Sequence, residues 1–144
     1  MTRTIFVLNG PNLNLLGTRQ PDVYGRATLD DIAATLADHA DTLGIALDLR
    51  QSNHEGHLID WLHEAQASGA TAVVINPGGY SHTSVALHDA ILAISTPVIV
   101  VHLTDPATRE PFRHTDLAAL AATLVIKGQG AQGYVTALDA AARL

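Results

Sequence analysis

Short apolar runs alternate along the chain with segments in which apolar residues recur at helical spacing. The runs that predict strands are TIFVLN at 4–9, IALDLR at 45–50, TAVVIN at 71–76, PVIVVHL at 97–103 and ATLVIK at 122–127. The first, third and fourth are apolar almost throughout, which is typical of strands that are covered on both faces. This regular alternation predicts an α/β fold with a parallel sheet.

The predicted helices have recognisable ends. Apolar side chains follow helical spacing over 29–43, directly after Thr28, a residue type favoured at N-caps. Gly44 stands where such a helix ends. Further helices are expected around 58–65, over 84–95 and after Gly133, whereas the mixed pattern of 106–120 predicts at most a short helix.

Five strand–helix units of this size predict a single flavodoxin-like domain over 1–144. In this three-layer α/β fold, a five-stranded parallel sheet has the strand order 2-1-3-4-5. Ligands of such sheets bind beyond the carboxyl ends of the strands, where the winding reverses between strands 1 and 3. The residues that follow the predicted strands are therefore the candidate site.

The composition of the chain excludes several classes of binding partner and of chemistry. The 144 residues carry 8 Lys and Arg and 14 Asp and Glu, a formal net charge of −6, so the whole chain repels nucleic acid and anionic membranes. Cysteine is absent, which rules out disulfides and thiolate catalysis. The longest apolar runs are far shorter than a membrane span, and the first ends in the polar NGPN, so no secretory signal is predicted. The cytoplasm is the expected location.

Polar residues follow three of the predicted strands. Asn9 and Asn12 come at the end of the first strand, Asn76 ends the third, and His102 ends the fourth. Asparagines near proline are also ordinary turn formers, and a lone histidine after an apolar strand is often a core residue with its own partner. The position at the switch point favours a binding role for Asn12 and makes one equally plausible for His102.

A long loop follows the first strand and carries Arg19 and Tyr24 between Gly17 and Gly25. Loops of this length usually act as lids or binding elements, and the two glycines are candidate hinges. A tyrosine is a base at neutral pH only where cations stabilise its phenolate, which Arg19 is placed to do. An exposed arginine beside a half-buried tyrosine is the more common explanation of such a pair.

The segment GGYSHTS precedes a predicted helix and suits a hydroxyl-rich or anionic ligand. Ser81, Thr83 and Ser84 are also good capping residues, a role that leaves His82 unexplained. No metal site is predicted, because the remaining histidines show only a weak HxxH spacing.

Two arginines lie four residues apart after the fourth strand. Arg109 and Arg113 are candidate donors to a carboxylate ligand. Surface ion pairs with Glu110 and Asp116 are the competing explanation.

Four blocks together resemble one family. NGPNLNLLGTRQPDVYG, RQSNHEGHLIDWLHEA, INPGGYSHTSVALHDA and GQGAQGYVTAL are similar, in the same order and across nearly the whole chain, to type II 3-dehydroquinate dehydratase. The resemblance implies a flavodoxin-like fold and a dodecamer built from trimers. It also implies removal of water from 3-dehydroquinate to give 3-dehydroshikimate, without metal or organic cofactor.

The resemblance also implies roles for individual residues. Tyr24 would be the base, with Arg19 stabilising its phenolate, Asn12 would stabilise the enolate through a water, and His102 would be the general acid. The substrate-binding residues would be Asn76 and His82 for the ring hydroxyls, Arg113 with the backbone near Leu103 and Thr104 for the carboxylate, and Asp89 from a neighbouring subunit.

Three positions depart from the family pattern. The family usually has a glutamate two residues before the histidine, where this chain has Val100, and losing that carboxylate predicts a weaker acid at His102. Asp105 replaces an asparagine, and His88 replaces a basic residue. A slow but working enzyme is therefore expected, serving either aromatic biosynthesis or quinate breakdown.

Two other hypotheses follow from these departures and from the fold. One is a catalytically impaired relative that binds a cyclic polyol carboxylate or acts as an assembly subunit. The other, a flavodoxin-like cofactor or phosphoacceptor module, is disfavoured because the first strand ends in Asn and Pro rather than a phosphate loop or an acidic cluster.

Overall fold

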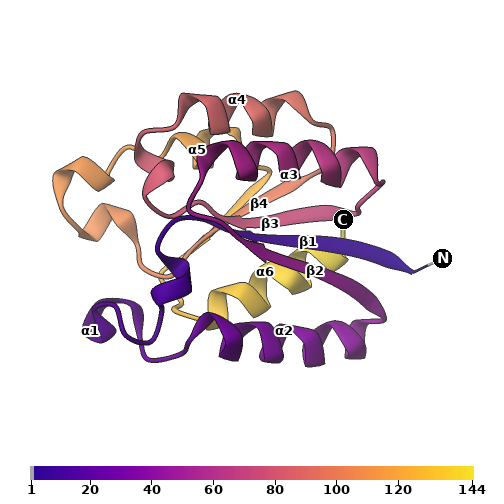
Figure 1. Ribbon diagram of the computed structural model, residues 1–144, viewed down its shortest axis with the longest axis horizontal. Helices are drawn as coiled ribbons and strands as arrows, with labels where there is room; N and C mark the ends of the chain where they lie inside the picture. The colour runs from indigo at the N-terminus through magenta and orange to yellow at the C-terminus, as the bar shows by residue number, and fades with distance from the viewer. Residues whose placement is uncertain (1) are drawn as a thin grey trace.

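A computed structural model describes residues 2–144 of the chain. Within this range the sheet has five parallel strands in the order β2-β1-β3-β4-β5, which confirms the predicted flavodoxin-like arrangement (Figure 1). The strands are β1 (Arg3–Asn9), β2 (Ile45–Gln51), β3 (Ala72–Asn76), β4 (Val98–His102) and β5 (Leu124–Lys127).

Helices cover both faces of the sheet (Figure 1). One face carries α2 (Leu29–Leu43) and α6 (Gln132–Ala142), and the other carries α3 (Glu55–Ala67), α4 (Val85–Ala93) and α5 (Leu117–Ala121). None of the helices in residues 2–144 is long and apolar enough to cross a membrane.

Alternation along β1 explains why its run is apolar throughout. Ile5 and Val7 pack into the cluster beneath α2 and α6, whereas Phe6 and Leu8 pack into the cluster beneath α3 and α4. Successive side chains of a strand point to opposite faces, so a strand covered on both sides buries every residue. The two clusters form the cores of the domain.

The ends of α2 follow the predicted signals. Thr28 Oγ1 accepts a hydrogen bond from the Asp31 amide at 3.0 Å, and the Asp31 carboxylate accepts one from the Thr28 amide at 3.0 Å. This reciprocal capping box satisfies amides that have no partner within the helix. The helix ends at Gly44, whose φ of 68° is the left-handed conformation that glycine adopts without steric cost.

The connections that had no clear sequence pattern contain several short turns of helix. These are η1 (Leu13–Leu15) and α1 (Pro21–Tyr24) after β1, η2 (Gly78–His82) after β3, and η3 (Pro106–Thr108) and η4 (Pro111–Arg113) after β4. Each follows a strand whose carboxyl end lies at the same edge of the sheet. The connections that contain these turns therefore carry most of the candidate site.

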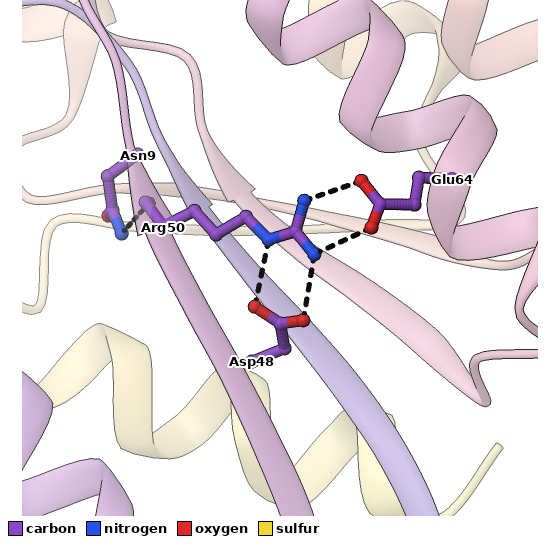
Figure 2. A network of polar contacts seen from close by, with 4 residues as sticks. All are labelled: Asn9, Asp48, Arg50 and Glu64. Carbon is purple, nitrogen blue, oxygen red and sulfur yellow. Dashed lines mark hydrogen bonds and ion pairs between the residues drawn. The ribbon is translucent and has the colours of Figure 1, made fainter.

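A polar network fastens the outer strand β2 to helix α3 (Figure 2). The Arg50 guanidinium donates two hydrogen bonds to Asp48, both at 2.9 Å, and two to Glu64, at 2.6 and 2.9 Å. Two-pronged pairs of this kind fix geometry as well as charge. The hydrogen bond from Arg50 outweighs burial and holds the pKa of Asp48 below its ordinary value. The backbone oxygen of Arg50 accepts from Asn9 Nδ2 at 3.1 Å, which ties the end of β1 to β2.

Candidate active site

A cavity of about 540 Å³ opens at the carboxyl edge of the sheet, beyond the ends of β1, β3 and β4. Nine of the ten residues predicted for the site line it: Asn12, Arg19, Tyr24, Asn76, His82, His102, Leu103, Thr104 and Arg113. They come from the ends of three strands, β1, β3 and β4, and from the connections that follow them. The switch point of the sheet therefore brings together the groups that the sequence singled out.

Two guanidinium groups lie beside Tyr24, the last residue of α1. The Arg19 and Arg109 guanidinium carbons lie 4.5 and 5.1 Å from the centre of its ring. Arg109 also donates a hydrogen bond from Nη1 to the Tyr24 hydroxyl at 2.8 Å. Two positively charged side chains thus contact Tyr24, Arg109 at its hydroxyl and Arg19 at its ring.

Arg109 as the direct partner of Tyr24 was missed from the sequence. The sequence placed Arg19 in that role and offered Arg109 only as a donor to a ligand carboxylate. The two partners are 85 residues apart, and nothing in the REPFR segment shows which loop it will face. Only the sheet order reveals that the connection after β4 lies against the connection after β1.

Asn12 is held in an unusual conformation. Its φ of 68° is left-handed, which asparagine tolerates better than most residues. The backbone N–H of Asn12 donates a hydrogen bond to Asn53 Oδ1 at 3.0 Å, and the same oxygen accepts one from Gln51 Nε2 at 3.2 Å. Asn53, two residues beyond the end of β2, therefore fixes the backbone of Asn12, and no pattern in the sequence indicated this role for Asn53.

The loops after β1 and β3 touch closely at Gly10. A side chain there would place its Cβ 2.4 Å from the carbonyl oxygen of Pro77, which is shorter than any real contact. Only glycine allows this approach, because it alone has no Cβ. The contact brings NGPN and NPGG together at the rim of the cavity.

Asn76 belongs to a buried network that fixes its amide. Tyr134 Oη donates to Asn9 Oδ1 at 2.6 Å and accepts from Asn76 Nδ2 at 3.0 Å, while Asn76 Oδ1 accepts from the Gly78 amide at 3.2 Å. Burial raises the pKa of Tyr134, and the hydrogen bond from Asn76 offsets only part of this rise, so the Tyr134 hydroxyl stays protonated. The network orients the Asn76 amide, leaving its second N–H for a ligand. Asn9, fully buried here, is structural.

His82 is oriented by the connection that precedes α5. Its Nδ1 donates to the carbonyl oxygen of Thr115 at 2.7 Å. A carbonyl only accepts, so Nδ1 carries the proton, and Nε2 remains for the cavity. Ser84 caps α4, accepting from the Leu87 amide at 2.9 Å, as the capping interpretation of this segment predicted.

His102 ends β4 and meets a carboxylate. Its Nε2 donates to Asp116 Oδ2 at 2.6 Å, and only 7% of the His102 side chain and 18% of the Asp116 side chain are exposed. Burial alone would raise the pKa of Asp116, but the hydrogen bond and charge of His102 hold it below its ordinary value. A carboxylate therefore reaches His102 even though Val100 stands at the position of the usual glutamate.

Arg113 lines the cavity and also makes the ion pair that was the competing explanation. Its Nε donates to Glu110, whose other oxygen lies 3.6 Å from Arg109 Nη2. Glu110 thus holds both arginines in place. The predicted partnership of Asp116 with an arginine does not form, since Asp116 faces His102 instead.

Two of the remaining positions lie away from the cavity. Asp89 is on the exposed side of α4, with 69% of its side chain exposed, where it pairs with His88 Nδ1 at 3.0 Å. Asp105 caps η3 by accepting from the Ala107 amide at 3.1 Å and lies 3.6 Å from Lys127 Nζ. Neither lines the cavity, so the extra charge of Asp105 is directed away from it.

Comparison with known proteins decides the family. The family model described as Dehydroquinase class II matches residues 3–142. The chain belongs to this family. It is 55% identical over 139 residues to the 3-dehydroquinate dehydratase of Rhodopseudomonas palustris (strain BisA53), covering 96% of this chain and 92% of that relative. It is 57% identical over 141 residues to the protein of the same name from Maricaulis maris (strain MCS10), covering 98% and 96%.

A solved member of the class II dehydroquinase family has nearly the same fold. The crystal structure of type II dehydroquinase from Propionibacterium acnes superposes with a TM-score of 0.95 at 40% identity, covering 100% of this chain and 99% of that one. The resemblance seen in the sequence blocks is thereby confirmed.

Proposed function

We propose that the chain dehydrates 3-dehydroquinate to 3-dehydroshikimate. The observation that carries this proposal is Tyr24 with its hydroxyl bonded to Arg109 and its ring beside Arg19, in one cavity with His102. Cations beside a tyrosine suit it to the role of a base, and a carboxylate beside a histidine suits it to the role of a proton donor. An elimination of water needs both.

The reaction proceeds through an enolate. The Tyr24 phenolate removes a proton from the carbon beside the ketone, and Asn12, through a water, stabilises the negative charge that develops on the ketone oxygen. The enolate then re-forms the ketone and expels the hydroxyl group, which takes a proton from His102 and leaves as water. Arg113 and the backbone near Leu103 and Thr104 bind the substrate carboxylate.

The two ring-hydroxyl contacts come from groups whose orientation is already fixed. Asn76 offers its second amide N–H, and His82 offers Nε2, because their other polar atoms are bonded within the protein. Preorganised groups lose little entropy when the ligand binds. Such contacts suit a substrate with several hydroxyl groups.

We also propose that the active form is a dodecamer built from four trimers, in which Asp89 reaches the cavity of a neighbouring subunit. Exposed apolar side chains on the same side of the molecule support assembly: Val85 and Leu92 on α4 and Leu120 on α5 are 59%, 61% and 76% exposed. Size-exclusion chromatography with light scattering tests this, and a monomer would contradict it.

The dehydratase proposal is tested by adding 3-dehydroquinate and following the ultraviolet absorbance of the conjugated enone product. Dehydration of 3-dehydroquinate is a step in both aromatic biosynthesis and quinate breakdown, so the assay applies whichever pathway the chain serves. An impaired binding subunit remains the second candidate because Val100 replaces the usual glutamate; binding of the substrate in calorimetry without turnover would support it.

A further inference from the structure

We propose that Asp116 is the positioning residue for His102, taking from helix α5 the role that the family gives to a glutamate at the position of Val100. The inference rests on the proposed function, in which His102 is the general acid. It adds a residue that the sequence comparison did not assign.

The contact has the geometry of a strong, shielded hydrogen bond. The 2.6 Å distance between His102 Nε2 and Asp116 Oδ2 joins two side chains that are both largely buried. Charge-assisted bonds are stronger than neutral ones, and they gain further where water is excluded. Among residues 2–144, Asp116 is the one carboxylate bonded to His102.

Val100 contributes no carboxylate at this place. It lies two residues before His102 on β4, fully buried in the apolar cluster beneath α3 and α4. Residues two apart on a strand point to the same face of the sheet. The N-terminus of α5 covers this face, so a carboxylate from α5 reaches His102 from the side on which the usual glutamate would stand.

The bond selects one form of the imidazole. A carboxylate accepts but does not donate, so Nε2 carries the proton and Nδ1 is the nitrogen left for the substrate. Nδ1 makes no hydrogen bond within the described chain, and it is not among the fully buried side-chain atoms that lack a partner. Because His102 lines the cavity, Nδ1 is accessible there, and the bond to Asp116 holds the ring with Nδ1 as the nitrogen that transfers a proton to the substrate.

Asp116 is itself rigidly placed. Its second oxygen, Oδ1, accepts from the Ala119 amide at 3.0 Å and caps α5. The preceding residue, Thr115, orients His82 through its carbonyl oxygen. The adjacent residues Thr115 and Asp116 thus fix the orientation of the two imidazole rings of the cavity, those of His82 and His102.

The competing explanation is that Asp116 only caps α5. The Asp116→Asn variant distinguishes this explanation from a role in positioning His102. The asparagine oxygen still caps α5, but its NH₂ faces His102 Nε2, which must then accept, so the proton moves to Nδ1. We expect kcat to fall by about 10–100-fold with KM changed less than about threefold. Asp105→Asn is the matched control, because Asp105 caps η3 in the same way and contacts no histidine; its kcat should stay unchanged.

The ¹⁵N NMR signals of the imidazole rings test the inference without any turnover. In the unmodified protein, neutral His102 should show a protonated Nε2, and in Asp116→Asn a protonated Nδ1. A protonated Nδ1 in the unmodified protein, or an unchanged tautomer and kcat in Asp116→Asn, would overturn the inference. Loss of dehydratase activity in every form, with the tautomer still set by Asp116, would instead refute the proposed function alone.

Discussion

Arg109 Nη1 lies 2.8 Å from the Tyr24 hydroxyl, whereas Arg19 meets only the face of the same ring. A hydrogen bond directed at the oxygen strengthens as negative charge develops there, while a cation over the ring acts from further away. We therefore expect the two arginines to contribute unequally to the base.

Replacing these arginines tests that difference. Arg109→Met should lower kcat by about 100-fold or more, and Arg19→Met should lower it less, because only the first removes a donor to the phenolate oxygen. Steady-state kinetics on both variants measure this. Arg3→Met is the control, since Arg3 lies at the opposite end of β1 and bonds only the Ala142 carbonyl. A larger loss for Arg19→Met would contradict the assignment of Arg109.

Tyr134 is expected to support both stability and substrate binding. Tyr134→Phe removes the hydroxyl between Asn9 and Asn76 and leaves both buried amides short of a partner, which costs about 1–3 kcal/mol of unfolding free energy. The freed Asn76 amide should also raise KM. Urea denaturation and kinetics measure the two effects.

Tyr80→Phe is the matched control for that experiment. The Tyr80 hydroxyl donates one bond, to the Asn53 carbonyl at 2.8 Å, in a less buried place. Its loss should cost about 1 kcal/mol or less. Equal losses of unfolding free energy in the two variants would show that the buried network stabilises the chain no more than a single exposed hydrogen bond does.

The network of Figure 2 predicts a pH-dependent stability. Because the pKa of Asp48 is lower in the folded chain than in the unfolded one, its contribution is complete above about pH 4 and is lost as the pH falls through the folded pKa. Arg50→Met should therefore cost about 1 kcal/mol near pH 6 and progressively less below pH 4. Urea unfolding of both proteins between pH 6 and pH 3 measures this, and a pH-independent difference would contradict it.

Gly10 is expected to tolerate no side chain. Gly10→Ala places its Cβ against the Pro77 carbonyl oxygen and should destabilise the chain by about 2 kcal/mol or more, because backbone must move. Gly56→Ala is the matched change, since an added Cβ in α3 meets nothing within 4 Å and should stabilise the helix by about 0.5–1 kcal/mol. Thermal unfolding measures both, and a stable Gly10→Ala protein would refute the predicted clash.

The sequence predicted the sheet because its signals are local. The apolar runs, the capping signal at Thr28 and the break at Gly44 each depend on neighbouring residues alone. The strand order then placed Asn12, Asn76 and His102 at one edge. Those parts of the site needed no knowledge of side-chain contacts.

The pairings that complete the site were not predictable in this way. Asp116 is 14 residues from His102, at the N-cap of a five-residue helix in a segment whose pattern was too mixed to orient it. An aspartate near two arginines is most simply expected to pair with them. Only the fold shows that Glu110 pairs with the arginines and that Asp116 is left for His102.

Turnover of 3-dehydroquinate by the purified chain, compared with a Tyr24→Phe variant, tests the central claim most directly. We predict enone absorbance that rises in proportion to the concentration of the unmodified protein and falls by about 100-fold or more in Tyr24→Phe, which keeps the ring but loses the base. No enone signal from the unmodified protein, or equal rates for the two, would contradict the account.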